Sequence, residues 1–587
     1  MSAAGRAKRW IRARRTLYLT AIAVVLGLLG GVAAWLLIHL IALITNLALF
    51  HQWGWKLPSF ANFHPDITLV IAAMLGGLVV SLLAKWSPVI RGHGIPEAME
   101  AVLTRQSRIA PPAAVAKPTS AAVAIGTGGP FGAEGPIIVT GGALGSLIGQ
   151  VIRVTPSERK ILLACGAAAG MSATFGVPLA AVVLAVELLL FEFSNRALIP
   201  LIAASAVAAA MHVAFFGQGP LFHVPQHDYE GLATLPVFAV VGLLCGLLAV
   251  LICKGLYLVE TGFRRLPVSE FWHPIIGAAL FACVGLAVPR ALGVGYDAID
   301  DVLANKLAVG TLLVLCLGKA VAWWFALGSG TSGGTLAPIL LISGAFGGLI
   351  GAGVAEVAPG LHLAPGAIAL VAMAATFGAA TRATFTAIVF AFELTHDFNS
   401  LLPIMLAAVI ADIVADAMLD HGLMTEKLAR RGLRVMRDYA PDDLQSALVR
   451  DAMTTQVAAL PSCATVGAAR DRIEENVHSA YPLVDEEHHC VGIVSRQDLL
   501  ADVADDLDPV LKIASTEVVT VAPDDTLQTV LELIVDEHVE HLPVVDAADH
   551  LVGICTRTDV LRARDRRRAS DTAEPGWRPR RRGRREP

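Results

Sequence analysis

The feature that most constrains the fold is a repeat of apolar segments interrupted by glycine. The run 136–149 matches the run 338–351 at an offset of 202, with Pro, Ile, Gly, Ala, Gly, Leu, Ile and Gly in register. A second block, 182–188, matches 388–394 at a similar offset, and both copies end in Glu-Leu. Such segments at corresponding positions of two halves are typical of membrane proteins built from inverted repeats, with a site where the halves meet. The alternative, that glycine-rich helix interfaces look alike everywhere, does not explain the shared order and near-equal offsets.

The composition places this repeat in a membrane. The chain has 587 residues, of which 55% are hydrophobic and 16% charged, whereas soluble domains carry about 25% charged residues. Long apolar runs dominate from Thr16 to about Leu419. Several runs are shorter than the ~20 residues of a spanning helix, and broken helices at membrane depth must be buried in protein or line a cavity. The sequence therefore predicts an all-α polytopic membrane protein with two repeated halves. The eight cysteines show no CxxC or metal-ligand spacing, so we expect reduced thiols and no metal site.

The remainder of the chain divides into a short basic end and a soluble module. Residues 1–16 carry a basic cluster that should stay in the cytoplasm. The pattern at 481–498 recurs 61 residues later at 542–559, and each copy indicates strand, turn, strand and helix. We therefore expect a small soluble α/β module. The predicted divisions are 1–16 basic N-terminus, 17–435 membrane domain, 436–449 linker, 450–505 and 506–562 repeats of the module, and 563–587 a disordered basic tail.

One carboxylate stands inside the first repeat. Glu134, within Gly132-Ala133-Glu134-Gly135-Pro136, is the single charged residue of the run 122–150. An acid at membrane depth is expensive and therefore marks a candidate functional site. The glycines allow close approach of backbone amides, and the proline suits the first turn of a helix, where free amides favour an anion. Glu134 is thus a candidate to compete with a mobile anion for one amide-lined site. The alternative is a buried ion pair with an Arg or Lys elsewhere.

Four motifs in order carry a family resemblance. They are Gly92-His93-Gly94-Ile95-Pro96-Glu97, the Glu134 pentapeptide, the stretch 170–187 with Phe175, Pro178 and Glu187, and Gly333-Gly334-Thr335-Leu336-Ala337-Pro338. Residues 17–435 resemble the CLC family of chloride channels and proton/chloride antiporters. The two soluble repeats resemble a tandem CBS pair, the cytoplasmic module that CLC proteins often carry.

The resemblance implies a CLC-type fold, an all-α polytopic membrane protein with inverted-topology repeats, that forms a homodimer with one anion pathway per subunit. In that pathway Glu134 is the gate. When Glu134 is ionised, its carboxylate occupies the outer anion site. When it is protonated, or displaced by an anion, the side chain swings out of that site and opens the pathway. The anion-binding positions implied are His93, Gly94, Ile95, Gly132, Gly135, Thr335, Leu336 and Met424. The implied location is a bacterial inner membrane with both termini in the cytoplasm. Chloride and similar anions, and protons, are the implied partners, with no nucleic acid, no required cofactor and no enzyme activity.

Four residues depart from the family pattern. His93 replaces a Ser hydroxyl donor; as a neutral ring it can donate one N–H to an anion, or it can turn aside and pair with backbone. Met424 aligns with a Tyr whose hydroxyl is the family's other central ligand, so that donor is missing. Ala133 replaces an Arg at the outer mouth. Leu188 replaces a Glu that proton-coupled members often carry after the residue matching Glu187, which favours passive transport.

These departures leave two mechanisms open. The leading prediction is chloride transport through a pathway gated by Glu134, similar to a voltage-gated chloride channel and modulated by the CBS pair. The alternative is a proton-coupled chloride antiporter. A divalent-cation channel with CBS domains is a remote alternative, since Mg²⁺ needs several acids with retained waters.

The CBS pair carries a second candidate site. The resemblance implies that Ser495 with Asp498, and Thr556 with Asp559, contact the phosphate and ribose of an adenine nucleotide. A carboxylate suits ribose hydroxyls and a hydroxyl suits phosphate. The alternative is that these residues cap the helix that follows each strand.

Overall fold

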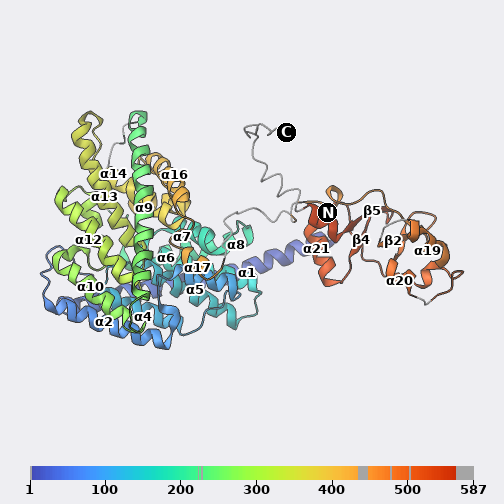
Figure 1. Cartoon of the computed structure of the whole chain (residues 1–587), viewed down its shortest axis with the longest axis horizontal. Helices are drawn as coiled ribbons and strands as arrows, with labels where there is room; N and C mark the ends of the chain where they lie inside the picture. Colours follow the sequence, from blue (N-terminus) through green and yellow to red (C-terminus); the bar gives the residue numbers. More distant parts are fainter. Residues whose placement is uncertain are drawn as a thin grey trace, which may run out of the picture. The chain divides into compact units, whose positions relative to one another are not determined.

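The computed structural model describes residues 3–222, 224–225, 229, 231–433, 444, 447–475, 479–501 and 504–563. The chain forms two units, 1–438 and 439–587, the first helical and the second containing the strands (Figure 1). The predicted linker 436–449 lies mostly outside the described residues, and the predicted tail lies outside them from residue 564 onward.

The helical unit consists of two halves of similar order. The first half contains α1 (Ala3–Leu49), α2 (Ile67–Trp86), α3 (Ile95–Thr104), α4 (Ala113–Gly126), α5 (Glu134–Val151), α6 (Pro156–Phe175), α7 (Pro178–Ala185) and α8 (Asn195–Phe216). The second contains α9 (Leu235–Arg264), α10 (His273–Ala287), α11 (Tyr296–Leu303), α12 (Val309–Gly328), α13 (Leu336–Val357), α14 (Pro365–Thr381), α15 (Thr384–Thr395) and α16 (Leu401–Met418), followed by α17 (Glu426–Arg430). Short helical turns are η1 (Pro88–Ile90), η2 (Val186–Leu190), η3 (Gly231–Thr234), η4 (Pro289–Ala291) and η5 (Pro359–Leu361).

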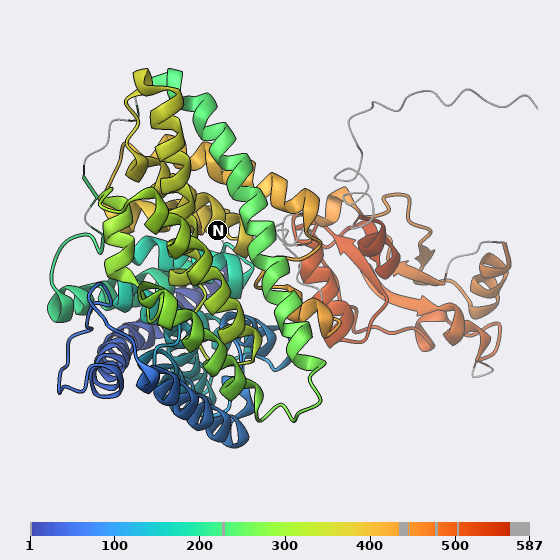
Figure 2. The same ribbon diagram turned by 60° about the vertical axis from the view of Figure 1, so that its left-hand side comes forward.

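The packing of the second half repeats that of the first with a shift of eight helix labels. Helix α5 packs on α6 as α13 packs on α14, and α1 contacts α6 and α8 as α9 contacts α14 and α16. Likewise α2 packs on α4 as α10 packs on α12. The second view of the ribbon separates the two sets of long helices (Figure 2). The all-α fold with two repeated halves, predicted from two sequence blocks, is confirmed over the whole unit.

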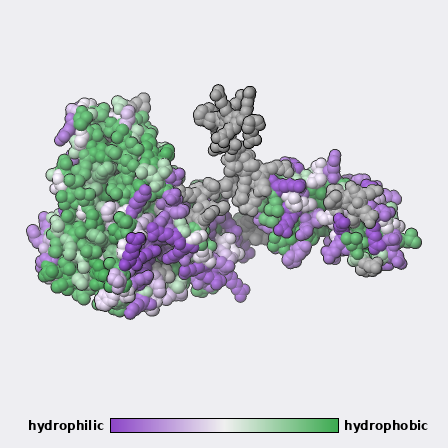
Figure 3. All heavy atoms as spheres, in the orientation of Figure 1, coloured by the Kyte–Doolittle hydropathy of each residue, from purple (hydrophilic) through white to green (hydrophobic). Residues whose placement is uncertain are grey.

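Apolar side chains cover the outside of this unit. Seven helices of the described part are long and apolar enough to cross a membrane, from Ala13–Leu49 to Leu401–Met418. The space-filling view shows apolar residues over most of the visible face of the helical unit (Figure 3). Helices α4, α5, α6, α13 and α14 are mainly buried among the others. The buried helices include the glycine-rich copies, as expected for segments that surround an internal site.

The broken helices α7 and α15 are tied together by two acids. The Glu187 carboxylate, on η2 after α7, accepts from the Thr386 backbone N–H at 3.0 Å and its hydroxyl at 2.5 Å. The Glu393 carboxylate, on α15, accepts from the N–H groups of Leu179 at 2.9 Å and Ala180 at 2.7 Å. Each acid therefore satisfies free amides at the start of the other helix. The two residues are reciprocal caps, in agreement with the structural role that their matching repeat positions suggest.

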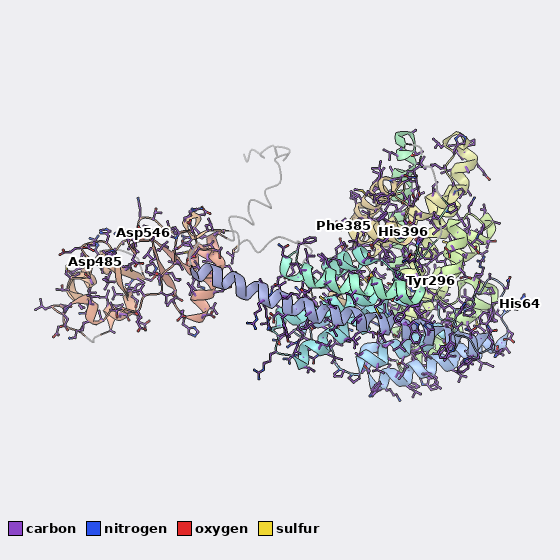
Figure 4. The ribbon with its side chains drawn as sticks, turned by 180° about the vertical axis from the view of Figure 1, so that it is seen from behind. His64, Tyr296, Phe385, His396, Asp485 and Asp546 are labelled. Atoms are coloured by element: carbon purple, nitrogen blue, oxygen red, sulfur yellow. The ribbon has the colours of Figure 1, made fainter. Side chains whose placement is uncertain are left out.

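The second unit repeats one α/β pattern. Strands β1 (Leu460–Pro461), β2 (Ala480–Val484) and β3 (Cys490–Ser495) form one sheet, and β4 (His541–Val545) and β5 (Leu551–Thr556) form another. The helices are α19 (Val466–Glu475), α20 (Arg496–Leu500) and α21 (Leu527–Asp536), with the turns η6 (Val449–Asp451) and η7 (Val510–Lys512). The antiparallel pair Ala480↔Ser495 has its counterpart 61 residues later in His541↔Thr556. Figure 4 labels Asp485 and Asp546, which lie in the corresponding turns of the two repeats.

Candidate functional site

Three glycine loops from separate parts of the sequence meet inside the helical unit. Gly132 and Gly334 form two backbone hydrogen bonds with each other. The N–H of Gly334 donates to the Gly132 carbonyl at 2.9 Å, and the N–H of Gly132 donates to the Gly334 carbonyl at 3.4 Å. Gly92 pairs with Ser332 as an isolated parallel bridge. These contacts bring together the starts of α3, α5 and α13, so three helix N-termini converge on one region.

The glycines of these loops are required by close backbone approach. A Cβ on Gly135 would fall against the His93 carbonyl oxygen and 3.3 Å from the Gly334 Cα. A Cβ on Gly94 would lie 2.8 Å from the Gly135 carbonyl oxygen, and the φ of Gly94 is +98°. No other residue type fits both positions without displacing a loop. The predicted site residues Gly94, Gly132 and Gly135 therefore lie together.

Glu134 is the first residue of α5 and is 1% exposed. One carboxylate oxygen, Oε1, accepts from the Tyr296 hydroxyl at 3.4 Å. The other, Oε2, has no hydrogen-bond partner in the described part of the chain, and a Cβ on Gly334 would lie 2.6 Å from it. The backbone N–H of Ala337, in the first turn of α13, also faces the carboxylate. Glu134 thus folds over the N-termini of α5 and α13, the kind of place that suits an anion.

His93 lies one loop away, is 1% exposed and has no partner at either ring nitrogen among the described residues. The alternative in which His93 turns aside and bonds to backbone is therefore not what the structure shows. Two cations, Lys117 and Lys427, interact electrostatically with the ring. The hydroxyl of Ser332, paired through its backbone with Gly92, also has no partner in that part of the structure. Buried polar atoms of this kind are rare unless a ligand completes them.

The other predicted anion ligands lie at the starts of α3 and α13 and in the loop before α17. Thr335 is the N-cap of α13 and Leu336 its first residue, while Ile95 is the first residue of α3. Met424 is buried in the loop before α17, and α17 packs on α3. The Tyr257 hydroxyl donates at 2.8 Å to the carbonyl of the neighbouring Leu423. The side chain of Met424 itself brings no donor.

Sequence reasoning missed Tyr296 and Lys319. Tyr296 begins α11 and lies within the helical unit (Figure 4). Lys319, fully buried on α12, donates from Nζ to the Gly293 carbonyl at 2.8 Å and interacts electrostatically with Glu134 and Asp297. A signal was present: Gly293-Val294-Gly295 repeats Gly92-His93-Gly94 at an offset of 201, and Lys319 repeats Lys117 at 202.

Two cavities lie beside the converging loops. One, of about 350 Å³, is lined by Gly92, Glu97 and several cations, among them Arg91, Lys427 and Arg430. The other, of about 170 Å³, is lined by Ser59, Phe60 and the segment 293–297, which includes Tyr296. The first reaches the loop of His93, and the second reaches the residue that bonds Glu134. The two cavities therefore reach a residue next to His93 and a residue that bonds Glu134, while neither is lined by His93 or Glu134 itself.

In the second unit the predicted nucleotide ligands act as helix caps. Asp498 Oδ2 accepts from the Ser495 N–H at 2.9 Å and hydroxyl at 2.7 Å. Asp559 Oδ2 accepts from the Thr556 N–H at 3.0 Å and hydroxyl at 2.6 Å. The four residues form two equivalent capping boxes.

Comparison with known proteins agrees with this geometry. The family model described as "Voltage gated chloride channel" matches residues 75–416, and the CBS domain model matches 449–505 and 510–566. The H(+)/Cl(-) exchange transporter ClcA of Vibrio parahaemolyticus serotype O3:K6 is 30% identical over 373 residues, covering 62% of this chain and 79% of that protein. ClcA of Vibrio cholerae serotype O1 (strain M66-2) is 30% identical over 419 residues, covering 69% and 88%.

Solved structures share the fold. A slow cyanobacterial Cl-/H+ antiporter has a TM-score of 0.61 at 24% identity, covering 71% of this chain and 98% of its own. A eukaryotic CLC transporter has a TM-score of 0.59 at 19% identity, covering 92% and 98%.

The repeated halves and the helix N-termini around Glu134 define a multi-pass membrane protein for anion transport. The chain belongs to the voltage gated chloride channel family, the CLC family, and carries a tandem pair of CBS domains.

Proposed function

We propose that this protein conducts chloride along a pathway that Glu134 gates, in the manner of a voltage-gated chloride channel. The observation that carries the proposal is the position of the Glu134 carboxylate over the N-termini of α5 and α13, with one oxygen left without a partner in the described part of the chain. An anion and this carboxylate compete for the same amides, so movement of the side chain opens the pathway. Backbone amides replace the hydration shell of a halide without trapping it.

The central part of the proposed pathway uses His93 where the family uses Ser. The unpartnered ring supports a role as N–H donor to the anion, together with the amides of Gly94, Ile95, Thr335 and Leu336. Met424 contributes no hydrogen bond, so the affinity of the central site for an anion comes from backbone amides and His93. The wall of the 350 Å³ cavity carries five Arg or Lys side chains and three Glu side chains, so its net positive charge attracts anions toward this site.

Dimerisation and membrane orientation belong to the same proposal. Helices α7, α8, α15 and α16 expose large apolar side chains, among them Leu179, Ile202, Phe385, Val409 and Ile413. This apolar face supports a homodimer with one pathway per subunit. The basic N-terminus supports a bacterial inner-membrane location with both termini in the cytoplasm.

Proton-coupled exchange is the second candidate, and the names of the Vibrio relatives favour it. Two features of this chain favour uncoupled conduction instead. Leu188 is a buried apolar residue where coupled members often carry Glu. Its neighbour Glu187 is engaged by Thr386 as a helix cap.

The test is the full chain in liposomes with a chloride gradient, with chloride efflux and external pH recorded together. Conduction without coupling predicts chloride efflux with no pH change, and a reversal potential equal to the chloride Nernst potential. Exchange predicts proton uptake driven by efflux, and its loss in Glu134→Ala. The matched control is Glu356→Gln, an exposed acid near the far end of α13, which should change neither signal. Absence of chloride flux in every variant would refute the proposal.

For the CBS pair we infer binding of an adenine nucleotide that modulates conduction. Support comes from the two CBS matches and from the equivalent Ser495–Asp498 and Thr556–Asp559 boxes. Calorimetric titration of ATP and AMP into the full chain tests this. Asp559→Asn should weaken binding, and Asp536→Asn, at the end of α21, is the control. Equal affinity in both variants would assign Asp559 to capping alone.

A further inference from the structure

The two halves of the helical unit build their Gly-x-Gly loops in the same way. In the first half, Lys117 Nζ donates to the carbonyls of Ile90 and Gly92, each at 2.7 Å, and the loop leads into α3. In the second half, Lys319 Nζ donates to the Gly293 carbonyl, and the loop leads into α11. All four glycines of these loops have positive φ. The loop before α11 is therefore the structural counterpart of the loop that carries His93.

The correspondence places Tyr296 where the first half has Ile95. Both are the first residue of their helix and both follow a glycine with positive φ, Gly295 and Gly94. Ile95 offers an amide and an apolar side chain, whereas Tyr296 adds a hydroxyl donor. That hydroxyl donates to Glu134 Oε1. Its ring is held edge-on by Phe175 and Phe222, with centroids 6.3 and 6.0 Å away, so the hydroxyl has a fixed place.

The surroundings of this hydroxyl are built for negative charge. Lys319 is fully buried, and its ammonium interacts with Glu134 although no direct salt bridge joins them. Tyr296 also lines the 170 Å³ cavity, so the space beyond Glu134 is continuous with the residue that bonds it. When the carboxylate swings away, the hydroxyl and the ammonium remain.

We propose that the Tyr296 hydroxyl is a ligand of the outer anion site, donating to the Glu134 carboxylate when that group fills the site and to the transported anion when it does not. This inference rests on the proposed function. It also accounts for the absent tyrosine at Met424: the chain keeps a tyrosine donor on its pathway, but on α11 and one site further out. The buried amine of Lys319, which interacts electrostatically with Glu134, accompanies it.

The test measures chloride binding by calorimetry on the purified full chain in a Glu134→Ala background, where the site is open. Tyr296→Phe removes the hydroxyl and keeps the ring against Phe175 and Phe222. We expect chloride affinity to fall about tenfold, as for loss of a hydrogen bond to a charged group. The matched control is Tyr229→Phe, a buried tyrosine whose hydroxyl donates at 2.9 Å to a different carboxylate, Asp397. It should leave chloride affinity unchanged.

The same substitution with Glu134 present separates a ligand from a simple latch. If the Tyr296 hydroxyl serves both ligands, its removal weakens binding of the Glu134 carboxylate as well as binding of chloride. The fall in chloride affinity should therefore be smaller with Glu134 present than in the Glu134→Ala background. A latch that served Glu134 alone would raise apparent chloride affinity with Glu134 present and do nothing in Glu134→Ala, and that pattern overturns the proposal. If the Glu134→Ala chain binds no chloride at all, the proposed function fails and this inference fails with it. If it binds chloride and Tyr296→Phe has no effect, this inference alone fails.

Discussion

Gly135→Ala tests whether the close approach of α5 to the His93 loop sets the pathway. The new Cβ would overlap the His93 carbonyl oxygen and lie 3.3 Å from the Gly334 Cα. Carbon and oxygen need more than 3 Å, so one loop must move by about 1 Å. Both neighbours are backbone, which cannot rotate away as a side chain would. Overpacking of this kind costs about 1–3 kcal/mol.

That strain falls on the geometry around Glu134, because Glu134 adjoins the substituted residue. A rise of about 1–3 kcal/mol in the barrier to conduction slows transport by about 5- to 150-fold. The assay is chloride efflux from liposomes, with thermal unfolding of the same preparation. The control on the same helix is Gly142→Ala, whose Cβ would lie 3.7 Å from Ala167 and Leu163 and therefore fits. It should be neutral or stabilising by up to about 1 kcal/mol. Equal efflux from both variants would refute the argument from close approach.

Two further predictions concern the first turn of α6 and the CBS unit. Glu158→Gln should lower the free energy of unfolding by about 1–3 kcal/mol, because Glu158 accepts hydrogen bonds from the charged side chains of Arg15 and Arg196, each at 2.8 Å. The unfolding temperature measures this loss. The exposed control Glu192→Gln should leave the unfolding temperature unchanged. In the CBS unit, burial lowers the pKa of His541 from 6.5. The unfolded chain then binds the proton more readily, so stability falls as pH drops below about 6.5. His541→Gln should flatten that part of a melting-temperature profile, and an unchanged profile would exclude His541 as the source.

Much of the fold was predictable because the repeats are visible in the sequence. The blocks at 136–149 and 338–351 predicted α5 and α13, and the recurrence at 481 and 542 predicted the paired strands of the CBS unit. The ends of individual helices were harder to predict from the sequence. Helix α1 begins at Ala3, within the predicted basic segment, since straight-chain basic residues are good helix formers and extend an apolar helix without a break.

The site was only partly predictable, for a physical reason. Glu134 and the glycines stand out because a charge or a missing side chain at membrane depth is unusual. Tyr296 and Lys319 do not, since a tyrosine at the start of a short helix and one lysine in an apolar run are ordinary locally. Their meaning comes from the second half folding onto the first, which brings Tyr296 within 3.4 Å of a residue 162 positions away. That information was carried by two offsets, that of the loop 293–295 from the loop 92–94 and that of Lys319 from Lys117.

The reciprocal caps give a final test of how far the repeat governs function. Glu393 accepts two backbone N–H groups, while Glu187 accepts the N–H and the hydroxyl of Thr386 and also faces the backbone N–H of Phe385. Replacing either with Gln removes the charge but keeps an acceptor oxygen. We expect both Glu187→Gln and Glu393→Gln to lower the unfolding temperature, because each acid caps amides at the start of the other helix. If Glu187 only caps α15, its variant leaves the ratio of proton to chloride movement in liposomes unchanged. A change in that ratio at unchanged stability would make Glu187 part of a proton route, and Leu188 would then no longer argue against coupling.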